Sequence, residues 1–303
     1  MGTHSPLTTH HSLFIGTCGW WYADWQGIVY PDLDRHDPLA FMARYFNALE
    51  INVSFYRDVN AAMAASWLRR VAHFRDFQFT AKLHQRFTHE RRDSFPTQEV
   101  ISSLAGLEPL REARRLGALL AQFPWSYRDD TNHRDWLRHI RDACAGHRLI
   151  VELRHDSWLR DDAAEFLRSL GVGFCNIDQP AHDHCIPPTE LVMSPVGYVR
   201  LHGRNHARWF DHDEASQRYD YLYTEHELDA WVGRIRRIAK QAQDTFVFTN
   251  NHFRGQAPAN ALELKAKLAG EPVEVPDTLL DEFPVLGKFA RPSKHEQQGR
   301  LFQ

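Results

Sequence analysis

Thr245 to Lys265 reads TFVFTNNHFRGQAPANALELK and joins three kinds of sequence. Thr245 to Thr249 is an apolar, β-branched and aromatic run of the kind that forms a strand buried on both faces. Asn250 to Gly255 is polar, and Pro258 suits the first turn of a following helix, where its missing N–H group breaks no hydrogen bond. The stretch therefore predicts a strand, a polar loop and a helix, and such a buried strand needs neighbouring strands.

Strand-like runs recur along the chain and alternate with helical patterns. The predicted strands lie at residues 13–19, 49–55, 77–83, 118–123, 149–153, 172–177, 198–202 and 245–249. The predicted helices lie at residues 38–49, 61–74, 98–116, 134–145, 161–170 and 225–241. The last of these helices has a clear start, because Thr224 and Glu227 have the spacing of a capping box. Eight alternating units favour an α/β fold with a single closed (β/α)8 TIM barrel over an open sheet.

The barrel has predicted boundaries near both ends of the chain. We expect it to span residues 13–283, after a flexible N-terminus at residues 1–12. Its sixth βα unit is predicted to be irregular, since residues 179–196 contain several prolines and no clear helical pattern. Residues 284–303 are predicted to form a C-terminal extension that ends in a flexible polar tail.

The composition is ordinary for a globular protein and excludes some classes of partner. The chain has 303 residues, is 43% hydrophobic and 25% charged, and carries a net charge of −3. It has neither a membrane-spanning apolar run nor a signal-peptide pattern, so we expect a cytoplasmic protein with no membrane partner. Its four cysteines are widely spaced, which favours free thiols. Because no global positive field is present, an anionic ligand must be held by a local cluster.

Polar residues gather at the predicted strand ends, where the sites of such barrels are built. The catalytic candidates are Glu50, Lys82, Glu152, Asp178 and His202. The substrate-binding candidates are Trp20, Tyr22, Asn52, Arg154, Arg200, Arg204, Asn250, Asn251, His252 and Arg254. Period-two alternation is expected to place Glu50, Asn52 and Ser54 on one face of the second strand.

The two glutamates in apolar strands allow several interpretations. Glu50 and Glu152 must have partners, because an unpaired charge in a barrel interior is costly. The first interpretation is an ion-pair network with Lys82, Arg154 and Arg200. The second is a divalent metal site for zinc, manganese or magnesium, with Glu50, Glu152, Asp178 and His202 as tentative ligands. The third is a carboxylate pair for glycoside hydrolysis.

The loops after the seventh and eighth strands suggest anion binding. They carry Arg204 beside His202, and then His252 and Arg254 before a predicted helix N-terminus, which is where barrel enzymes commonly hold phosphate. The alternative is that these arginines pair with surface carboxylates. The aromatic residues of the WWYADW stretch at 20–25 are expected either to stack on sugars or bases or to plug one end of the barrel.

Several motifs together resemble a known family. They are IGTCGWWYADWQGIVYP, LEINVSFYR, LGALLAQFP, LIVELRHDSW, YVRLHGRN, YDYLYTEHELDAW and NNHFRGQAPANALEL. With these motifs in this order, the chain resembles the YecE-like family, domain of unknown function 72, from Ile15 to about Leu268. The resemblance implies a TIM barrel and no established activity. Cys18 and Trp21 stand where the family usually has serine, and Val53-Ser54 replaces a usual Ser-Thr pair.

The chain ends in QGRLFQ, which resembles a different kind of signal. Bacterial repair and replication proteins dock on the sliding clamp through a short peptide of this type, with Gln298, Leu301 and Phe302 as the anchors here. We therefore expect a possible sliding-clamp partner through residues 298–302.

These observations lead to one leading hypothesis and two alternatives. The leading one is a hydrolase that acts on a phosphate-bearing substrate such as a phosphodiester or nucleic acid, with strand-end carboxylates as metal ligands or acid/base groups. The first alternative is a metal-free carbohydrate-active enzyme that uses Glu50 and Glu152. The second is a noncatalytic binding module for nucleic acid or the sliding clamp.

Overall fold

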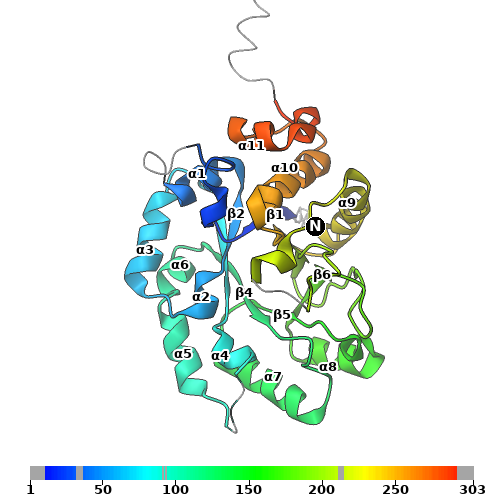
Figure 1. Ribbon diagram of the computed structural model, residues 1–303. Helices are drawn as coiled ribbons and strands as arrows, with labels where there is room; N and C mark the ends of the chain where they lie inside the picture. Colours follow the sequence, from blue (N-terminus) through cyan, green and yellow to red (C-terminus); the bar gives the residue numbers. More distant parts are fainter. Residues whose placement is uncertain (1–10, 32–36, 91, 93, 211–214, 292–303) are drawn as a thin grey trace, which may run out of the picture.

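The structure is a closed barrel of parallel strands surrounded by helices. Figure 1 shows it as a computed structural model, which describes residues 11–31, 37–90, 92, 94–210 and 215–291. Eight parallel strands follow one another in the order β1 to β8, and β8 pairs with β1 to close the barrel. The helices form a ring around the strands (Figure 1). The predicted TIM barrel is confirmed.

The strands are short and mostly buried. They are β1 (Ser12–Cys18), β2 (Ala48–Ile51), β3 (Gln78–Lys82), β4 (Leu116–Gln122), β5 (Leu149–Glu152), β6 (Gly173–Asp178), β7 (Val196–Leu201) and β8 (Asp244–Thr249). The closing pair runs from Ser12 opposite Asp244 to Thr17 opposite Thr249. Thr245 to Thr249 is buried throughout, which explains why this run is apolar and does not alternate with polar residues.

The helices cover the outside of the barrel and begin where the sequence predicts in several cases. They are α1 (Pro38–Tyr45), α2 (Val53–Tyr56), α3 (Ala61–Arg70), α4 (Gln85–Thr88), α5 (Thr97–Ala105), α6 (Glu108–Glu112), α7 (Thr131–Ala143), α8 (Asp161–Ser169), α9 (Glu225–Ala239), α10 (Gln256–Ala269) and α11 (Asp277–Glu282). The predicted capping box of Thr224 and Glu227 is present at α9.

Two predicted elements differ from the structure. The second strand ends at Ile51 and not at residue 55, because the chain turns at Asn52 into α2, where the Ser54 hydroxyl donates a hydrogen bond to the Ile51 carbonyl. The predicted alternation of Glu50, Asn52 and Ser54 along one face is therefore wrong. The predicted helix at 98–116 is divided into α5 and α6 at Gly106, where a Cβ atom would lie 1.7 Å from the Val59 carbonyl oxygen.

The irregular sixth unit is confirmed. No helix is assigned between β6 and β7, a segment that the structure describes in full. Instead the buried Asn176 side chain holds this loop, since its Oδ1 accepts hydrogen bonds from the Leu191 N–H and the Thr189 hydroxyl and its Nδ2 donates to the Leu191 carbonyl. A buried polar strand residue thus organises the backbone of this loop.

The C-terminal segment packs on the barrel beyond the predicted boundary at residue 283. A short 3₁₀ helix, η5 (Pro284–Lys288), buries Leu286, and Val273 pairs with Ala290 in an isolated β-bridge. The predicted clamp peptide at residues 298–302 and most of the predicted N-terminal segment lie outside the described residues. Within the described chain, no helix combines the length and the apolar character needed to cross a bilayer.

Candidate functional site

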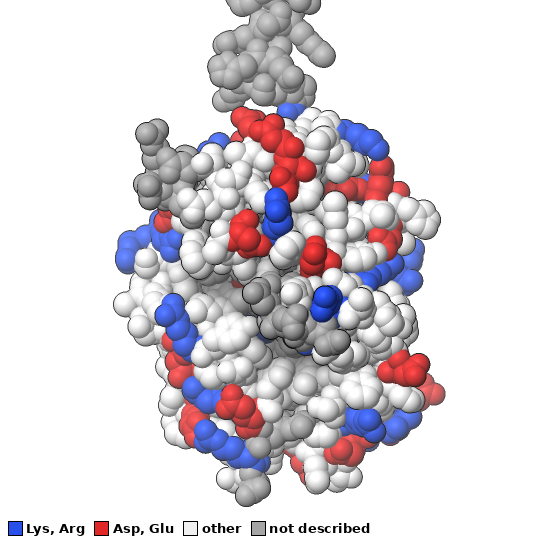
Figure 2. Space-filling model, viewed as in Figure 1, with Lys and Arg blue, Asp and Glu red and all other residues white. Residues whose placement is uncertain are grey.

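A cavity of about 470 Å³ opens at the carboxyl ends of β1, β2, β3 and β8. It is lined by Gly19, Trp20, Trp21, Tyr22, Asn52, Val53, Tyr56, Arg57, Met63, Trp67, Lys82, Tyr219, Asn250 and His252. Figure 2 shows this face of the molecule, with white side chains between scattered Lys, Arg, Asp and Glu side chains. The cavity therefore lies at the end of the barrel where the sequence predicts the site.

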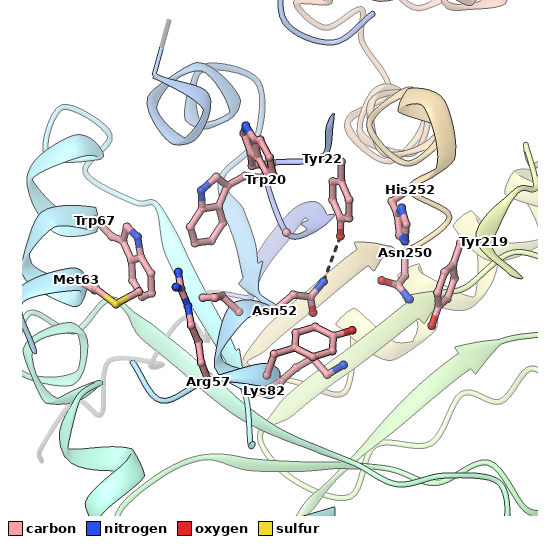
Figure 3. Close-up of a pocket in the computed structure, with 14 residues that line it drawn as sticks. Trp20, Tyr22, Asn52, Arg57, Met63, Trp67, Lys82, Tyr219, Asn250 and His252 are labelled. Atoms are coloured by element: carbon pink, nitrogen blue, oxygen red, sulfur yellow. Dashed lines mark hydrogen bonds between the residues drawn. The ribbon is translucent and has the colours of Figure 1, made fainter. Parts of the chain in front are cut away.

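Aromatic rings form two walls that face each other across Asn52 (Figure 3). On one side Trp20 meets Trp67 edge-on, with ring centroids 5.5 Å apart. On the other side Tyr22 stacks on His252 at 4.3 Å with an angle of 11° between the planes, and Tyr219 lies 5.0 Å from the same imidazole. Such walls suit a flat ring or an apolar face of a ligand.

The loop after β1 is shaped to place these rings. Gly19 has a φ of 78°, and a Cβ atom there would lie 2.8 Å from the Tyr22 hydroxyl. That hydroxyl donates a 2.6 Å hydrogen bond to the Cys18 carbonyl, which holds Tyr22 over the strand end. Trp25 is fully buried, and its indole N–H donates to the His252 carbonyl at 2.7 Å. Trp25 thus plugs the barrel end, whereas Trp20 and Tyr22 face the cavity.

Lys82 is the cation at the base of the cavity. It is the last residue of β3 and 8% exposed, and its Nζ lies 4.0 Å from the centre of the Phe55 ring. Within the described chain Lys82 has no hydrogen bond and no ion pair. Burial and the nearby Arg200 charge lower the pKa of Lys82 to about 8. The ammonium therefore loses water without gaining an anionic partner.

Two more polar atoms beside the cavity have no partner. Asn52 Oδ1 and His252 Nδ1 are buried, and neither has a hydrogen bond. Burial lowers the pKa of His252 to about 4, so this imidazole is neutral at pH 7. Buried polar atoms without partners are uncommon in folded proteins, and two of those in the described chain belong to residues that line this cavity. They indicate contacts that a ligand completes.

The cavity has a positive lining. Arg57 is an exposed side chain at its edge and, like Lys82, forms no ion pair with any described residue. No aspartate or glutamate is present among the described residues that line the cavity. In Figure 3 the Arg57 side chain points toward Trp20 and Trp67, whereas Lys82 lies lower in the view. The arrangement offers two cations and no competing carboxylate to an anionic ligand.

An ion-pair network fills the barrel beneath the cavity, although Arg200 Nε has no hydrogen-bond partner in it. Arg200 is 1% exposed and lies between two carboxylates, with its Nη2 2.8 Å from Glu50 Oε1 and its Nη1 bonded to Glu152 Oε2. The Tyr198 hydroxyl donates to Glu50 Oε2 at 2.8 Å, and Arg154 donates to Glu152 Oε1 at 2.7 Å. Burial alone would raise the pKa of Glu152, but Arg200, His202 and Arg154 hold it well below its ordinary value.

His202 joins this network as a neutral imidazole. Its Nε2 lies 3.2 Å from Glu152 Oε1, although the angle is not that of a regular hydrogen bond, and its Nδ1 lies 2.9 Å from Asn250 Nδ2. Burial, together with Arg154 and Arg200, lowers the pKa of His202 to about 3 despite Glu152. With Asn250 as the donor, the imidazole proton is on Nε2 and faces Glu152.

The positions of Glu50 and Glu152 decide between the interpretations of these two residues. Both are fully buried, neither lines the cavity, and their oxygens are bound by arginine and tyrosine side chains. The ion-pair network is therefore the arrangement that the structure contains, except that Lys82 forms no direct pair in it. None of the predicted catalytic residues Glu50, Glu152 and His202 lines the cavity, and a glycosidase pair using the two carboxylates is not supported by this arrangement.

Asp178 and Arg204 form a separate cluster outside the cavity. Arg204 binds Asp178 with two hydrogen bonds of 2.8 and 2.6 Å and also donates to Glu227 at 2.9 Å. Asp178 further accepts hydrogen bonds from Tyr223 at 2.9 Å and Trp231 at 2.5 Å. Its carboxylate has no oxygen left for a metal or a substrate proton. Asp178, predicted as catalytic, and Arg204, predicted in an anion clamp, are thus paired with each other and do not line the cavity.

The loop after β8 also differs from the predicted anion clamp. Arg254 is 55% exposed and pairs with Glu282 at 3.0 Å, while its backbone N–H donates to Asp24 at 2.7 Å. A carboxylate of the same chain thus occupies the position predicted for phosphate. Asn251 is buried and donates to the Tyr221 carbonyl and to Asn260 Oδ1, both at 2.8 Å. Neither Arg254 nor Asn251 lines the cavity.

The proposed metal ligands are not gathered around one point. Among the described residues, a single group of three or more His, Cys, Asp or Glu side chains brings its ligand atoms within 4.8 Å of one another, namely His155, Asp156 and His184. His155 Nδ1 accepts a hydrogen bond from the Ser157 N–H there, and the group does not line the cavity. Glu50, Glu152, Asp178 and His202 do not form such a group, and arginine side chains pair with their carboxylates.

Part of the predicted substrate-binding set lines the cavity, together with residues that were not in that set. The predicted residues that line the cavity are Trp20, Tyr22, Asn52, Lys82, Asn250 and His252. Arg154 and Arg200 lie in the network instead. Four lining residues, namely Arg57, Met63, Trp67 and Tyr219, do not lie at strand ends and were not predicted from them. They come from helices and from the segment after β7. For Arg57, its place in the LEINVSFYR motif was the signal available.

The comparisons agree with this fold. The family model described as "Protein of unknown function DUF72" matches residues 14–282. A crystal structure of a DUF72 family protein from Thermotoga maritima is 34% identical, with a TM-score of 0.75, and the match covers 86% of this chain and 100% of that one. For a DUF72 family protein from Enterococcus faecalis the values are 21%, 0.74, 85% and 95%, a likeness of fold alone. No curated protein matches the chain. The chain therefore belongs to the DUF72 family.

Proposed function

We propose that the cavity binds a phosphate-bearing small molecule, or a nucleotide unit of a nucleic acid, with the phosphate on Lys82 and Arg57 and a flat ring between the aromatic walls. The observation that carries this proposal is the lining itself. It has two cations without ion pairs, no carboxylate among its described residues, and aromatic rings on two sides.

The free-energy cost of burying the Lys82 charge without a partner supports an anionic ligand. A buried charge without a partner is costly, whereas a hydrogen-bonded pair with an anion recovers part of that cost. Because burial has already removed water from Lys82, a bound phosphate gains more from this cation than from an exposed lysine. Stacking on Trp20 or Tyr22 adds about 1–3 kcal/mol for a nucleobase.

The hydrolase hypothesis changes with this geometry. The carboxylates on which it depended are bound in the network and do not line the cavity. Among the described lining residues, Lys82 is the side chain best placed to act on a bound ligand, since its pKa of about 8 lies near physiological pH. We therefore propose that any reaction here depends on Lys82.

The second candidate is a noncatalytic module that binds nucleic acid, because exposed aromatic side chains lie at the edge of the cavity. Trp21 is 59% exposed and Tyr56 is 68% exposed, and both line the cavity. Exposed aromatic rings next to an anion pocket suit the bases that adjoin a terminal phosphate in a single strand. An oligonucleotide with and without a 5′-phosphate therefore belongs in the same binding test.

The test compares ligands that differ only in phosphate. Nucleoside monophosphates and ribose 5-phosphate are titrated against the protein beside the free nucleosides and ribose, with tryptophan fluorescence as the measurement. We expect the phosphate form to bind at least about 10-fold more tightly, because a charge-assisted hydrogen bond contributes about 1.5–3 kcal/mol. Lys82→Met and Arg57→Gln should each remove most of this preference.

Arg138→Gln is the matched control, because Arg138 is a half-exposed arginine of α7 that does not line the cavity. Its ligand affinities should equal those of the wild type. Equal affinities for the phosphate and free forms, or a preference that survives in Lys82→Met, would contradict the proposal. Hydrolysis of phosphodiesters is assayed on the same panel of proteins.

A further inference from the structure

We infer that Lys82 is a nucleophile that forms an imine with a phosphate-bearing aldehyde or ketone held in the cavity. This inference rests on the proposed function for the binding of phosphate in this cavity. For a carbonyl substrate the phosphate lies on Arg57 at the edge, and the carbonyl carbon takes the place beside Lys82. The inference adds the chemical class of the substrate and the bond that is made. It starts from the geometry of one amine.

Lys82 is more deeply buried than Lys265 and Lys267 and, unlike them, has no hydrogen bond or ion pair with any described residue. The Lys265 ammonium donates a hydrogen bond to the Tyr45 carbonyl, and Lys267 forms an ion pair of 2.6 Å with Asp229. Lys82 Nζ lies over the Phe55 ring at 4.0 Å and opens to the cavity. An amine without hydrogen bonds can turn its lone pair toward a bound carbon atom, whereas a hydrogen-bonded ammonium cannot.

The surroundings of Lys82 favour the neutral amine, which is the reactive form. Burial and the positive charge of Arg200 both disfavour the ammonium, as in enzymes that activate a lysine beside a second cation. With a pKa of about 8, roughly a tenth of Lys82 is neutral at pH 7, against less than about a thousandth of an ordinary lysine. Glu50 and Glu152 do not reverse this effect, since Arg200 is shared between them.

The chemical step balances without another reagent. The Lys82 nitrogen attacks the carbonyl carbon, so a C–N bond forms while the C=O π bond breaks, and one N–H proton moves to the carbonyl oxygen. The resulting carbinolamine loses the hydroxyl group and the remaining N–H proton as water, which leaves a C=N bond. No oxidant or reductant is consumed, and the imine makes the adjacent carbon acidic for later proton transfer or elimination.

The two cations of the cavity allow binding and reaction together. When Lys82 is neutral it no longer attracts phosphate, but Arg57 keeps its charge at every physiological pH. Arg57 lies at the edge and Lys82 at the base, so a phosphate at the edge directs the other end of the ligand inward (Figure 3). The substrate class that fits is a short compound with a phosphate at one end and a carbonyl group near the other.

Reductive trapping tests this inference. The full chain is incubated with pyridoxal 5′-phosphate, which has an aldehyde, a flat ring and a phosphate, and then with cyanoborohydride, which reduces an imine to a stable secondary amine. Peptide mass spectrometry measures the adduct on each lysine. We expect Lys82 to carry at least about 10-fold more adduct than the exposed Lys240, and trapping on Lys82 to become faster as pH rises through 8.

Two variants separate this inference from the proposed function. Lys82→Arg keeps the positive charge but has no amine that forms an imine, so it should retain affinity for nucleoside monophosphates and lose the adduct at residue 82. Lys240→Arg is the matched control and should leave the adduct on Lys82 unchanged. Ribose 5-phosphate and an oligonucleotide with an abasic site serve as further carbonyl probes, with trapping on Lys82 again expected.

The outcomes are distinct. If Lys82 is labelled no more than Lys240 by every probe while phosphate ligands still bind, the imine inference is wrong and the proposed function stands. If pyridoxal without phosphate labels Lys82 as fast as its phosphate does, the imine inference stands and the phosphate seat is wrong. Adduct on Lys82 that depends on the phosphate, and that is lost in Lys82→Arg with binding retained, supports both.

Discussion

Arg200 and Lys82 are both buried cations near the carboxyl ends of the barrel strands, yet their surroundings are opposite. Arg200 is held by Glu50 and Glu152 and also donates to the Cys18 sulfur at 3.3 Å. Lys82 lines the cavity, lies over the Phe55 ring and has no ion pair with any described residue. A charge whose partners are all present supports the fold, whereas a charge that lacks a partner indicates where a ligand acts.

The difference follows from the chemistry of the two side chains. The planar guanidinium of Arg200 can serve two carboxylates in fixed directions, so one residue neutralises two buried glutamates. The compact ammonium of Lys82 changes its protonation more readily when buried, which suits a reactive group. The barrel thus separates a permanent charge inside from an adjustable charge in the cavity.

The largest expected effect on stability comes from removing Arg200 from its ion pairs with Glu50 and Glu152. Arg200→Met leaves Glu50 and Glu152 buried without their shared partner, so we expect the free energy of unfolding to fall by about 3–5 kcal/mol. Urea unfolding followed by circular dichroism measures the loss. Arg200→Lys, which keeps the charge but not the two-sided geometry, should lose less.

Arg138→Met provides the matched control for this prediction. Arg138 and its partner Asp135 have side chains that are 50% and 56% exposed, and an exposed pair contributes about 0–1 kcal/mol. Similar losses in Arg200→Met and Arg138→Met would show that the network is not a major support of the fold. If Arg200→Met does not fold, the Arg200→Lys variant still allows the comparison with Arg138→Met.

Lys82→Met should stabilise the fold, in contrast to Arg200→Met. Methionine removes an unpaired buried charge and keeps the contact with Phe55. We therefore expect the free energy of unfolding of the variant at pH 7 to exceed that of the wild type by about 1–3 kcal/mol. The ligand affinity falls at the same time. A more stable variant that binds less well would show that Lys82 is kept for function.

The pH dependence gives this prediction a sign that can be checked. The pKa of Lys82 is about 8 in the folded chain and near 10.5 in the unfolded chain, so the unfolded state holds more protons between these values. The wild type therefore gains stability relative to Lys82→Met as pH rises from 8 toward 10.5. The advantage of the variant is largest below pH 8, and a constant difference across this range would contradict the argument.

The sequence predicts the fold better than it predicts the site. The apolar run from Thr245 to Thr249 and the capping box at Thr224 depend on local patterns, and both are present in the structure. The end of β2 at Ile51 is set by a turn at Asn52, and no alternation of residue types announces it. The eight strands could be counted from the sequence because strands that are buried on both faces appear as apolar runs between helical patterns.

The site was harder to predict because it depends on which charges find partners. Glu152 and Lys82 look equivalent as polar residues at strand ends, but Glu152 is bound by Arg154 and Arg200 while Lys82 is bound by neither carboxylate. The pairing of Glu152 with Arg200 joins β5 to β7, which are far apart in the chain. Tyr219 enters the cavity from the long segment after β7, where no strand-end rule applies.

The smallest expected effect concerns Arg254, which the sequence placed in an anion clamp. Its guanidinium is 55% exposed and paired with Glu282, so Arg254→Gln should change the free energy of unfolding by less than about 1 kcal/mol. Because Arg254 does not line the cavity, nucleoside monophosphate affinity should change less than about twofold, whereas Arg57→Gln weakens it strongly. Titration of both variants in parallel makes the comparison. A loss in Arg254→Gln as large as that in Arg57→Gln would return the phosphate to the loop after β8, and the distinction between paired and unpaired cations would no longer locate the site.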